Sequence, residues 1–324
     1  MKTIPELLQQ LTQCIEAEPL DRQPKTLYDP IKYALSLGGK RMRPLLVLLA
    51  YQLYKEDTET ALPAAIAIEY FHNFTLIHDD VMDKADIRRG KPTIHKVWNE
   101  TTAILSGDNM LILAFKHMAA VPAQHLKAAM DLFIETATQI DEGQQMDIDF
   151  EKRSDVTEEE YIEMIRLKTS VLLGCSMQIG AILAEASEAD AQALYNFGIN
   201  LGLSFQLQDD LLDVYGDPET FGKKIGGDIL CNKKTYMLIQ ALKHAGPLQC
   251  TELKRWLTRE RFNPQQKINA VTHIYDTVGV RQMAEEKINL YFNAALDALE
   301  TVQLSAERKQ VLLELAYKLL NRQS

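Results

Sequence analysis

The sequence DDVMD at residues 79–83 recurs further along the chain as DDLLD at residues 209–213, so both copies read Asp-Asp-apolar-apolar-Asp. Each copy follows an apolar stretch with helical spacing, residues 66–77 in the first case and residues 201–207 in the second. We therefore predict that each copy lies near the C-terminal end of a helix that lines the core. Its first and last Asp are four residues apart, which places them on one face of that helix.

Three carboxylates on one helix are unfavourable for folding, because they repel one another and lie near the negative end of the helix dipole. A divalent cation would compensate their charge. Carboxylate ligands without His or Cys in the motif favour Mg²⁺ over zinc, and Mg²⁺ completes its octahedron with water and substrate phosphate oxygens. A single acidic trio is as readily a solvated surface, but two copies embedded in apolar sequence indicate a metal site.

The spacing of apolar residues is helical through most of the chain, as in residues 7–15 and 304–319. No proline occurs between Pro122 and Pro218, and good helix formers fill that interval, which predicts several long packed helices. None of the breaks is typical of a flexible linker, so we expect an all-α protein with a single domain over residues 1–324. We place the breaks at residues 21–28, 37–44, 88–92, 153–157, 216–227 and 261–265.

The composition excludes several classes of function. The chain of 324 residues has a net charge of −10, which disfavours nucleic acid as a partner. Its longest apolar run, residues 61–68, is far shorter than the ~20 residues of a membrane-spanning helix. The N-terminal segment has no apolar stretch typical of a signal peptide, and the four cysteines are scattered without metal-ligand spacing. We expect a cytoplasmic protein with reduced thiols.

Basic segments accompany both Asp clusters. GGKRMRP at residues 38–44 precedes them, residues 88–91 follow the first cluster, and lysines at 223, 224, 233 and 234 follow the second. Cations beside metal-binding carboxylates favour an anionic ligand held from both sides, a diphosphate rather than a single carboxylate. The glycine-rich segment at residues 222–228 does not have the pattern of a nucleotide-binding P-loop.

Together these motifs resemble those of the trans-isoprenyl diphosphate synthases, the head-to-tail prenyltransferases of the all-α isoprenoid synthase fold. The resemblance runs from about Tyr28 to the C-terminus, and the motifs stand in the family's order. They are GGKRMRP at 38–44, HDDVMD with ADIRRGKPT at 78–93, GQQMD at 143–147, LKT at 167–169, FQLQDDLLD at 205–213 and GKKIGGD at 222–228. The resemblance implies a helical bundle around a deep cavity, a homodimer and three Mg²⁺ ions.

The resemblance also assigns roles to individual residues. Asp79 and Asp83 would hold two Mg²⁺ ions on the allylic diphosphate and Asp209 the third. Asp80, Asp210 and Asp213 would contact the metal ions only through water or through the other ligands. The residues matching the isopentenyl diphosphate contacts are Lys40, Arg43, His72 and Arg89. Those matching the allylic contacts are Arg88, Lys168, Thr169, Gln206, Lys223 and Lys233, of which Lys168, Gln206 and Lys223 are taken as catalytic. His78 is expected to be structural.

One motif departs from the family pattern. The usual EGKxT appears here as CNKKT at residues 231–235, which leaves two neighbouring lysines as candidates for the diphosphate contact. We assign that contact to Lys233 rather than Lys234.

The implied reaction begins when cationic groups and Mg²⁺ stabilise the negative charge on the departing allylic diphosphate, so that the C–O bond ionises. An apolar cavity would keep water from the carbocation, and the isopentenyl double bond attacks it instead. Loss of a proton, to the released diphosphate, completes a product one C5 unit longer. No side-chain general base is expected.

Product length is predicted from the aromatic residues that precede the first Asp cluster. The family places its length gate five residues before the first Asp, which is Phe74 here, next to Thr75. Together with Phe71 it would close the floor of the cavity; the alternative is that both are ordinary core aromatics. The segment is most similar to archaeal-type geranylgeranyl diphosphate synthases. We expect a C20 product, with C15 second and a medium or long chain as a further alternative.

Three other readings compete with this one. A terpene cyclase shares the first Asp motif but usually lacks GGKRMRP and DDLLD. A non-catalytic subunit of a heteromeric prenyltransferase would have lost metal ligands, whereas both clusters are intact here. A di-metal bundle of the ferritin type needs Glu-x-x-His pairs, and none frames these clusters.

Overall fold

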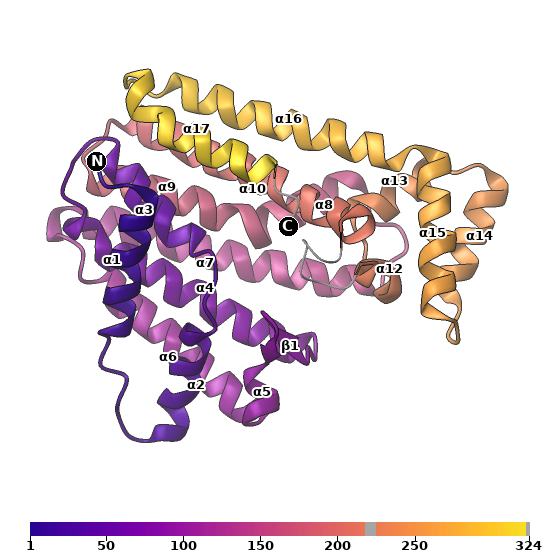
Figure 1. The fold of residues 1–324 in the computed structure, drawn as a ribbon, viewed down its shortest axis with the longest axis horizontal. Coiled ribbons are helices and arrows are strands. Elements are labelled where there is room, and N and C mark those ends of the chain that lie inside the picture. Colours follow the sequence, from indigo (N-terminus) through magenta and orange to yellow (C-terminus); the bar gives the residue numbers. More distant parts are fainter. Residues whose placement is uncertain (218–224, 322–324) are drawn as a thin grey trace. The chain divides into compact units, whose positions relative to one another are not determined.

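The computed structural model describes residues 1–217 and 225–321 (Figure 1). Its helices confirm the all-α class, and a two-stranded antiparallel hairpin of β1 (Ile87–Arg88) and β2 (Lys91–Pro92) is the sole sheet of the described residues. Each predicted break overlaps a segment between helices, although residues 25–28, 42–44, 227 and 264–265 belong to the first turns of helices and residues 218–224 lie outside the described part of the chain. No helix in the described ranges has the length and apolar character needed to cross a membrane.

The chain divides into two compact units. Unit 1 contains Met1–Ile134 and Cys175–Tyr195, and unit 2 contains Glu135–Gly174 and Asn196–Ser324. The unit boundaries fall inside three helices, α7 (Ala123–Glu151), α9 (Val171–Leu183) and α10 (Glu188–Tyr215). The single domain predicted from the sequence stays a prediction, and each unit is described by itself below.

Unit 1 is built around α4 (Leu62–Met82), which packs along α6 (Glu100–Met118) and α3 (Met42–Gln52). Because α4 is apolar on nearly all sides, it is buried over most of its length. The other elements of this unit, besides its parts of α7, α9 and α10, are α1 (Ile4–Glu16), α2 (Lys25–Ser36), α3 (Met42–Gln52), η1 (Glu59–Ala61), α4 (Leu62–Met82), the hairpin, α5 (Ile94–Val97) and α6 (Glu100–Met118).

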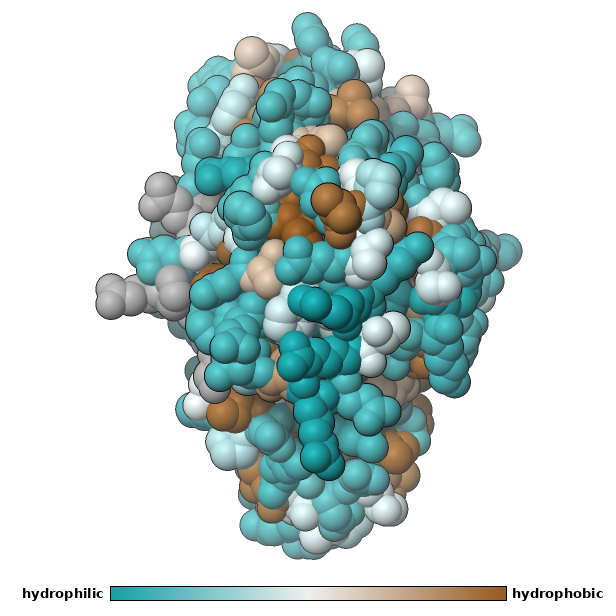
Figure 2. All heavy atoms as spheres, turned by 90° about the vertical axis from the view of Figure 1, so that its right-hand side faces the viewer, coloured by the Kyte–Doolittle hydropathy of each residue, from teal (hydrophilic) through white to brown (hydrophobic). Residues whose placement is uncertain are grey.

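Unit 2 has an apolar core to which α8, α10, α13, α15 and α16 contribute. Its surface around α14 and α15 is mainly hydrophilic, with apolar side chains in small groups (Figure 2). Besides its parts of α7, α9 and α10, the unit contains α8 (Glu158–Ile165), the π-helical turn η2 (Arg166–Ser170), α12 (Gly227–Cys231), α13 (Tyr236–His244), α14 (Pro247–Thr258), α15 (Pro264–Val278), α16 (Val280–Thr301) and α17 (Ala306–Leu320).

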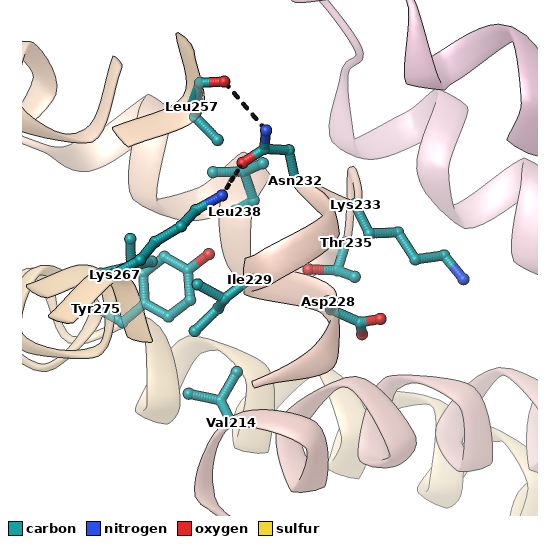
Figure 3. Close-up of a pocket in the computed structure, with 11 residues that line it drawn as sticks. Val214, Asp228, Ile229, Asn232, Lys233, Thr235, Leu238, Leu257, Lys267 and Tyr275 are labelled. Carbon is teal, nitrogen blue, oxygen red and sulfur yellow. Dashed lines mark hydrogen bonds between the residues drawn. The ribbon is translucent and has the colours of Figure 1, made fainter. Parts of the chain in front are cut away.

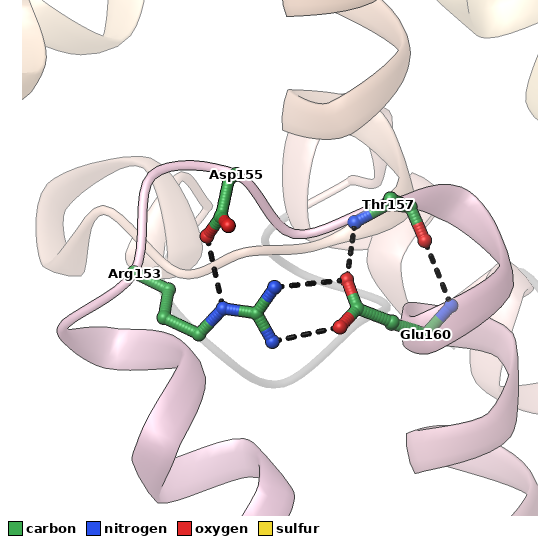
Figure 4. A network of polar contacts seen from close by, with 4 residues as sticks. All are labelled: Arg153, Asp155, Thr157 and Glu160. Carbon is green, nitrogen blue, oxygen red and sulfur yellow. Dashed lines mark hydrogen bonds and ion pairs between the residues drawn. The ribbon is translucent and has the colours of Figure 1, made fainter.

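The start of α8 is fixed by a capping box. The Thr157 hydroxyl accepts from the Glu160 N–H at 3.2 Å, and the Glu160 carboxylate accepts from the Thr157 N–H at 2.9 Å. Arg153 then bridges that carboxylate through both terminal nitrogens and reaches Asp155 through Nε (Figure 4). This network holds the turn between α7 and α8, just ahead of the η2 turn that carries the LKT motif.

Candidate active site

The first Asp cluster ends α4 in unit 1, as predicted. The Asp83 N–H donates to the Asp79 carbonyl at 2.8 Å, so the helical spacing of the two residues continues through the helix end. Asp80, with 5% of its surface exposed, accepts from Arg88 Nε at 2.9 and 2.8 Å and pairs with its terminal nitrogen at 2.8 Å. Asp79 is half-buried and Asp83 is exposed. The buried carboxylate is therefore paired by the protein, and the two assigned to metal are the more accessible ones.

The GGK turn of unit 1 holds Arg89. Gly38 and Gly39 have φ values of 72° and 135°, which favour glycine, and the Arg89 guanidinium donates to the Gly38 carbonyl. A Cβ on Gly39 would lie 2.7 Å from the guanidinium carbon, so the second glycine makes room for this side chain. Lys40 follows directly in the same turn.

Arg43 and His72 form the next part of this cluster, with 3.2 Å between an Arg43 terminal nitrogen and His72 Nε2. Burial lowers the pKa of His72 well below its usual value, and the charges of Arg43 and Arg89 lower it further. The imidazole is therefore neutral at neutral pH, and Nε2 accepts from the guanidinium. All four residues predicted for isopentenyl diphosphate, Lys40, Arg43, His72 and Arg89, thus belong to unit 1.

Glu69 is a residue of this region that sequence reasoning missed. Only 4% of its surface is exposed, and its Oε1 accepts from the Asn73 side chain at 3.1 Å. Burial raises the pKa of Glu69, although the charges of Arg41, Arg89 and Arg43 act in the opposite direction. A charged residue inside the apolar stretch, three positions before His72, is the signal that could have revealed it.

A pocket of unit 1 lies between α2, α4, the hairpin and α5. Asp80, Arg88 and Arg89 supply its charged groups, and Leu37, Leu76 and Ile77 supply apolar surface. The basic and acidic motifs of this unit therefore border one pocket.

The two phenylalanines predicted to set product length are buried in unit 1. Phe71 is 1% exposed and Phe74 9% exposed, and their ring centroids lie 5.6 Å apart. Phe71 also packs edge-on against Phe133 at 5.3 Å, and Phe74 against the His78 ring at 4.8 Å. His78 in turn lies 3.0 Å from the Ile104 carbonyl through Nε2, which fits the structural role expected for it.

The second Asp cluster lies in the last turns of α10 in unit 2. Asp210 is 4% exposed and accepts from the Tyr161 hydroxyl and, at 3.3 Å, from the Gln206 amide. Burial, together with the charge of Asp228, raises the pKa of Asp210 to about 8. Asp213 accepts from the Asp228 N–H at 3.0 Å, at the start of α12. Asp210 and Asp213 thus both have partners within the protein.

Asp147, the last residue of GQQMD, contacts two lysines of unit 2. It accepts from Lys168 Nζ at 2.6 Å, and Lys233 Nζ lies 3.9 Å from the same oxygen. Burial would raise the pKa of Asp147, but the charges of Lys233 and Lys168 outweigh it and lower the pKa. No role was predicted for Asp147, because its partners are distant in the sequence.

The π-helical turn η2 carries Lys168 and Thr169. π-Helical turns are rare in proteins, and those that occur are often found at functional sites. The Thr169 hydroxyl donates to Gln206 Oε1 at 3.3 Å, and Gln206 donates in turn to Asp210. The predicted residues Lys168 and Lys233 therefore meet at Asp147, and Thr169 and Gln206 connect to Asp210, whereas Lys223 lies outside the described residues. Lys234 turns back to donate to the Asn232 carbonyl at 3.1 Å.

Comparison with known proteins places this arrangement in a family. A family model described as polyprenyl synthetase matches residues 24–275. The geranylgeranyl diphosphate synthase of Methanosarcina mazei is 45% identical over 231 residues, which are 70% of this chain and 71% of that protein. A crystal structure of a geranylgeranyl pyrophosphate synthase superposes with a TM-score of 0.95 at 42% identity and covers both chains fully.

A third relative was solved with its ligands. It is the geranylgeranyl pyrophosphate synthase of Corynebacterium glutamicum complexed with isoprenyl diphosphate and magnesium, with a TM-score of 0.85 at 27% identity and 98% of each chain covered. The chain belongs to the polyprenyl synthetase family of isoprenyl diphosphate synthases.

The oxygen donors of the two Asp clusters suit magnesium. No three His, Cys, Asp or Glu side chains within residues 1–217 and 225–321 are already gathered in a metal-binding group. Mg²⁺ typically takes one or two protein carboxylates and fills its remaining positions with water and substrate phosphates. An exposed Asp83, a half-buried Asp79 and a half-buried Asp209 are donors of that kind.

Proposed function

We propose that this enzyme condenses isopentenyl diphosphate with allylic diphosphates and releases geranylgeranyl diphosphate, C20, as its main product. Relatives at 45% and 42% identity carry that name. Farnesyl diphosphate, C15, is the second candidate. One observation supports the reaction most strongly: in each Asp cluster the buried member is bound by protein groups, Asp80 by Arg88 and Asp210 by Tyr161 and Gln206. The less buried members, Asp79, Asp83 and Asp209, are carboxylates of the kind that Mg²⁺ binds together with water and substrate phosphates.

The metal part of the proposal is specific. Asp79 and Asp83 would hold two Mg²⁺ ions and Asp209 would hold a third. When bound, Mg²⁺ neutralises the charge that develops on the departing diphosphate. The solved relative with magnesium supports the choice of metal.

The protein groups divide between the two substrates. Isopentenyl diphosphate is bound by Lys40, Arg43, His72 and Arg89. This assignment is supported by the Arg43–His72 contact and by the hydrogen bond from Arg89 to the Gly38 carbonyl of the GGK turn. Arg88, Lys168, Thr169, Gln206, Lys223 and Lys233 bind the allylic diphosphate. Lys168 and Lys233 share Asp147 before substrate binds, and their cations then stabilise the leaving diphosphate.

The remaining steps follow from this division. Once the allylic C–O bond breaks, the electron pair leaves with the diphosphate, and the isopentenyl double bond supplies the electrons of the new C–C bond. The proton lost from the isopentenyl unit passes to the released diphosphate. Apolar side chains keep water from the carbocation, and Phe74 and Phe71 limit how far the product can grow.

The test is incubation of the purified protein with isopentenyl diphosphate and C5, C10 or C15 allylic diphosphates, with and without Mg²⁺, followed by chain-length determination. We expect Mg²⁺-dependent elongation that stops at C20. Asp79→Asn and Asp209→Asn should each lower kcat by at least about 100-fold, with Asp57→Asn, on a surface turn of unit 1, as the control. Absence of elongation with every primer would instead support a non-catalytic subunit that needs a partner.

A homodimer and a cytoplasmic location complete the proposal. Light scattering on the purified chain tests the first, since a monomer at working concentration would contradict it.

A further inference from the structure

Lys267 on α15 is a fully buried lysine, with 0% of its surface exposed. Its Nζ donates to the Asn232 side chain at 2.6 Å and to the Leu230 carbonyl at 3.2 Å, and it lies 4.4 Å from the centre of the Phe262 ring. Burial of an ammonium group is expensive unless its donors are satisfied. These neutral acceptors and the aromatic ring therefore stabilise it, and the loss of either carbonyl oxygen would be costly.

Asn232 connects this lysine to a second helix. Its side-chain amide donates to the Leu257 carbonyl at 3.0 Å, so one side chain joins the end of α12 to α14 and α15 (Figure 3). The Asn232 backbone has φ 56° and ψ 33°, a left-handed conformation that Gly adopts most easily. The family pattern EGKxT has Gly at this position. Asn232 is less stable than Gly in this left-handed backbone conformation, but its side chain makes two hydrogen bonds that Gly cannot make.

Lys233 follows Asn232 directly. Its N–H donates to the Asp228 carbonyl at 2.9 Å, its carbonyl accepts from the Thr235 N–H at 2.9 Å, and its Nζ reaches toward Asp147. In Figure 3 the side chains of Lys267 and Lys233 lie on opposite sides of the α12 turn, with Asn232 between them. The direction in which Lys233 leaves the turn is therefore set by a backbone that Asn232 fixes to α14 and α15.

We propose that Lys267 and Asn232 are positioning residues that hold Lys233 in the orientation in which it binds the allylic diphosphate. This inference rests on the role proposed above for Lys233. Neither residue touches the substrate. They act by fixing the main chain at the end of α12, so that the Lys233 ammonium does not have to be ordered when the diphosphate arrives.

The experiment compares steady-state kinetics of the wild type, Lys233→Ala and Lys267→Met with a C15 allylic diphosphate and isopentenyl diphosphate. Lys233→Ala first tests the proposed function, since an unchanged KM for the allylic substrate would remove Lys233 from the site. Given that effect, Lys267→Met should raise the same KM by about 10-fold and leave the KM for isopentenyl diphosphate unchanged. In the double variant, Lys267→Met should add nothing to Lys233→Ala.

Two controls separate positioning from loss of folding. Lys287→Met removes a lysine of the same unit that pairs with Glu158 at 2.8 Å, and it should leave both KM values unchanged. If Lys267→Met does not fold, Asn232→Gly, which suits the left-handed backbone, should give the same selective rise. Asn232→Asp keeps the oxygen that accepts from Lys267 but loses the donor to the Leu257 carbonyl, so it should raise the allylic KM less than Asn232→Gly does. Additive effects in the double variant, or an unchanged allylic KM in Lys267→Met and Asn232→Gly, would overturn the proposal.

Discussion

Glu69 shows how a single buried carboxyl group contributes to the chemistry of unit 1. It lies one helical turn before His72 on α4, among arginines that are proposed to bind a diphosphate. Its raised pKa means that burial costs its charged form more than the neighbouring arginines return. The ionised form of Glu69 is therefore disfavoured in the folded protein, and an incoming diphosphate would add more negative charge beside it.

We predict that Glu69→Gln stabilises the protein at pH 8 and has little effect at pH 4.5. A group with a raised pKa in the folded state contributes stability that is present below its unfolded pKa and lost as the pH rises through its folded pKa. Gln keeps the acceptor for Asn73 and removes that loss. Thermal unfolding at the two pH values measures it, with exposed Glu16→Gln as control. A gain of equal size at both pH values would contradict the explanation.

Phe74 carries the prediction on product length. Its ring is held by Phe71 and His78, so removing it opens space beside α4 that the neighbouring rings do not fill. Phe74→Ala should make products of C25 or longer, as read by chromatography of the dephosphorylated alcohols. Phe115→Ala removes another ring of the same aromatic group, which touches Phe133 and not Phe74, and should leave C20 as the main product. An unchanged length in Phe74→Ala would show that both phenylalanines are only core residues.

Among the elements, the η2 turn depends on close approach by two helices of unit 2. A Cβ on Gly143 of α7 would lie 2.8 Å from Leu167 Cβ and closer still to the backbone nitrogen of Lys168. A Cβ on Gly202 of α10 would lie 2.7 Å from Ser170 Cα. A π-helical turn widens the helix by one residue. Glycines opposite it provide the space, and so Lys168 and Thr169 reach Asp147 and Gln206.

Gly143→Ala should therefore destabilise the protein by about 1–3 kcal/mol through overpacking and also lower kcat, because Lys168 is displaced. Chemical denaturation and steady-state kinetics measure the two effects. Gln145→Ala changes an exposed residue of the same helix and should alter neither. A fully active, fully stable Gly143→Ala would mean that the η2 turn tolerates movement.

The elements also show what could be predicted from sequence. The placement of both Asp clusters near helix ends and the approximate positions of six helix breaks were predicted correctly, because periodicity, prolines and turn residues are local signals. Other breaks, such as those between α6 and α7 and between α9 and α10, were missed. Asp147 and Glu69 were missed, since the role of Asp147 depends on partners up to 86 positions away and that of Glu69 on burial. The two-residue strands of the hairpin are too short for an alternating pattern.

At the scale of the whole molecule, unit 1 is built from two segments that are separated in the sequence by part of unit 2. Unit 1 needs residues 175–195: Gly180 packs against Ala50 and the Val47 carbonyl, and Asp190 accepts from the Tyr54 hydroxyl at 3.0 Å. The sequence gives no sign of this division, because the boundaries fall inside helices with uninterrupted periodicity.

A fragment of residues 1–134 should accordingly fail to form unit 1. Without residues 175–195, apolar surface of α3 stays uncovered, and we expect dye-detected hydrophobic surface with no cooperative thermal transition. The full chain is the control for both measurements. A fragment that unfolds cooperatively would show that the second segment is dispensable.

The interrupted order of unit 1 also has a consequence during synthesis. The DDVMD segment leaves the ribosome roughly 5–20 s before Tyr195, at ordinary rates of translation. During that interval the helices around it cannot complete their core, and their apolar faces are open to chaperones and to other nascent chains. The rate of translation over residues 84–195 is therefore a determinant of how much active enzyme a cell obtains from each message.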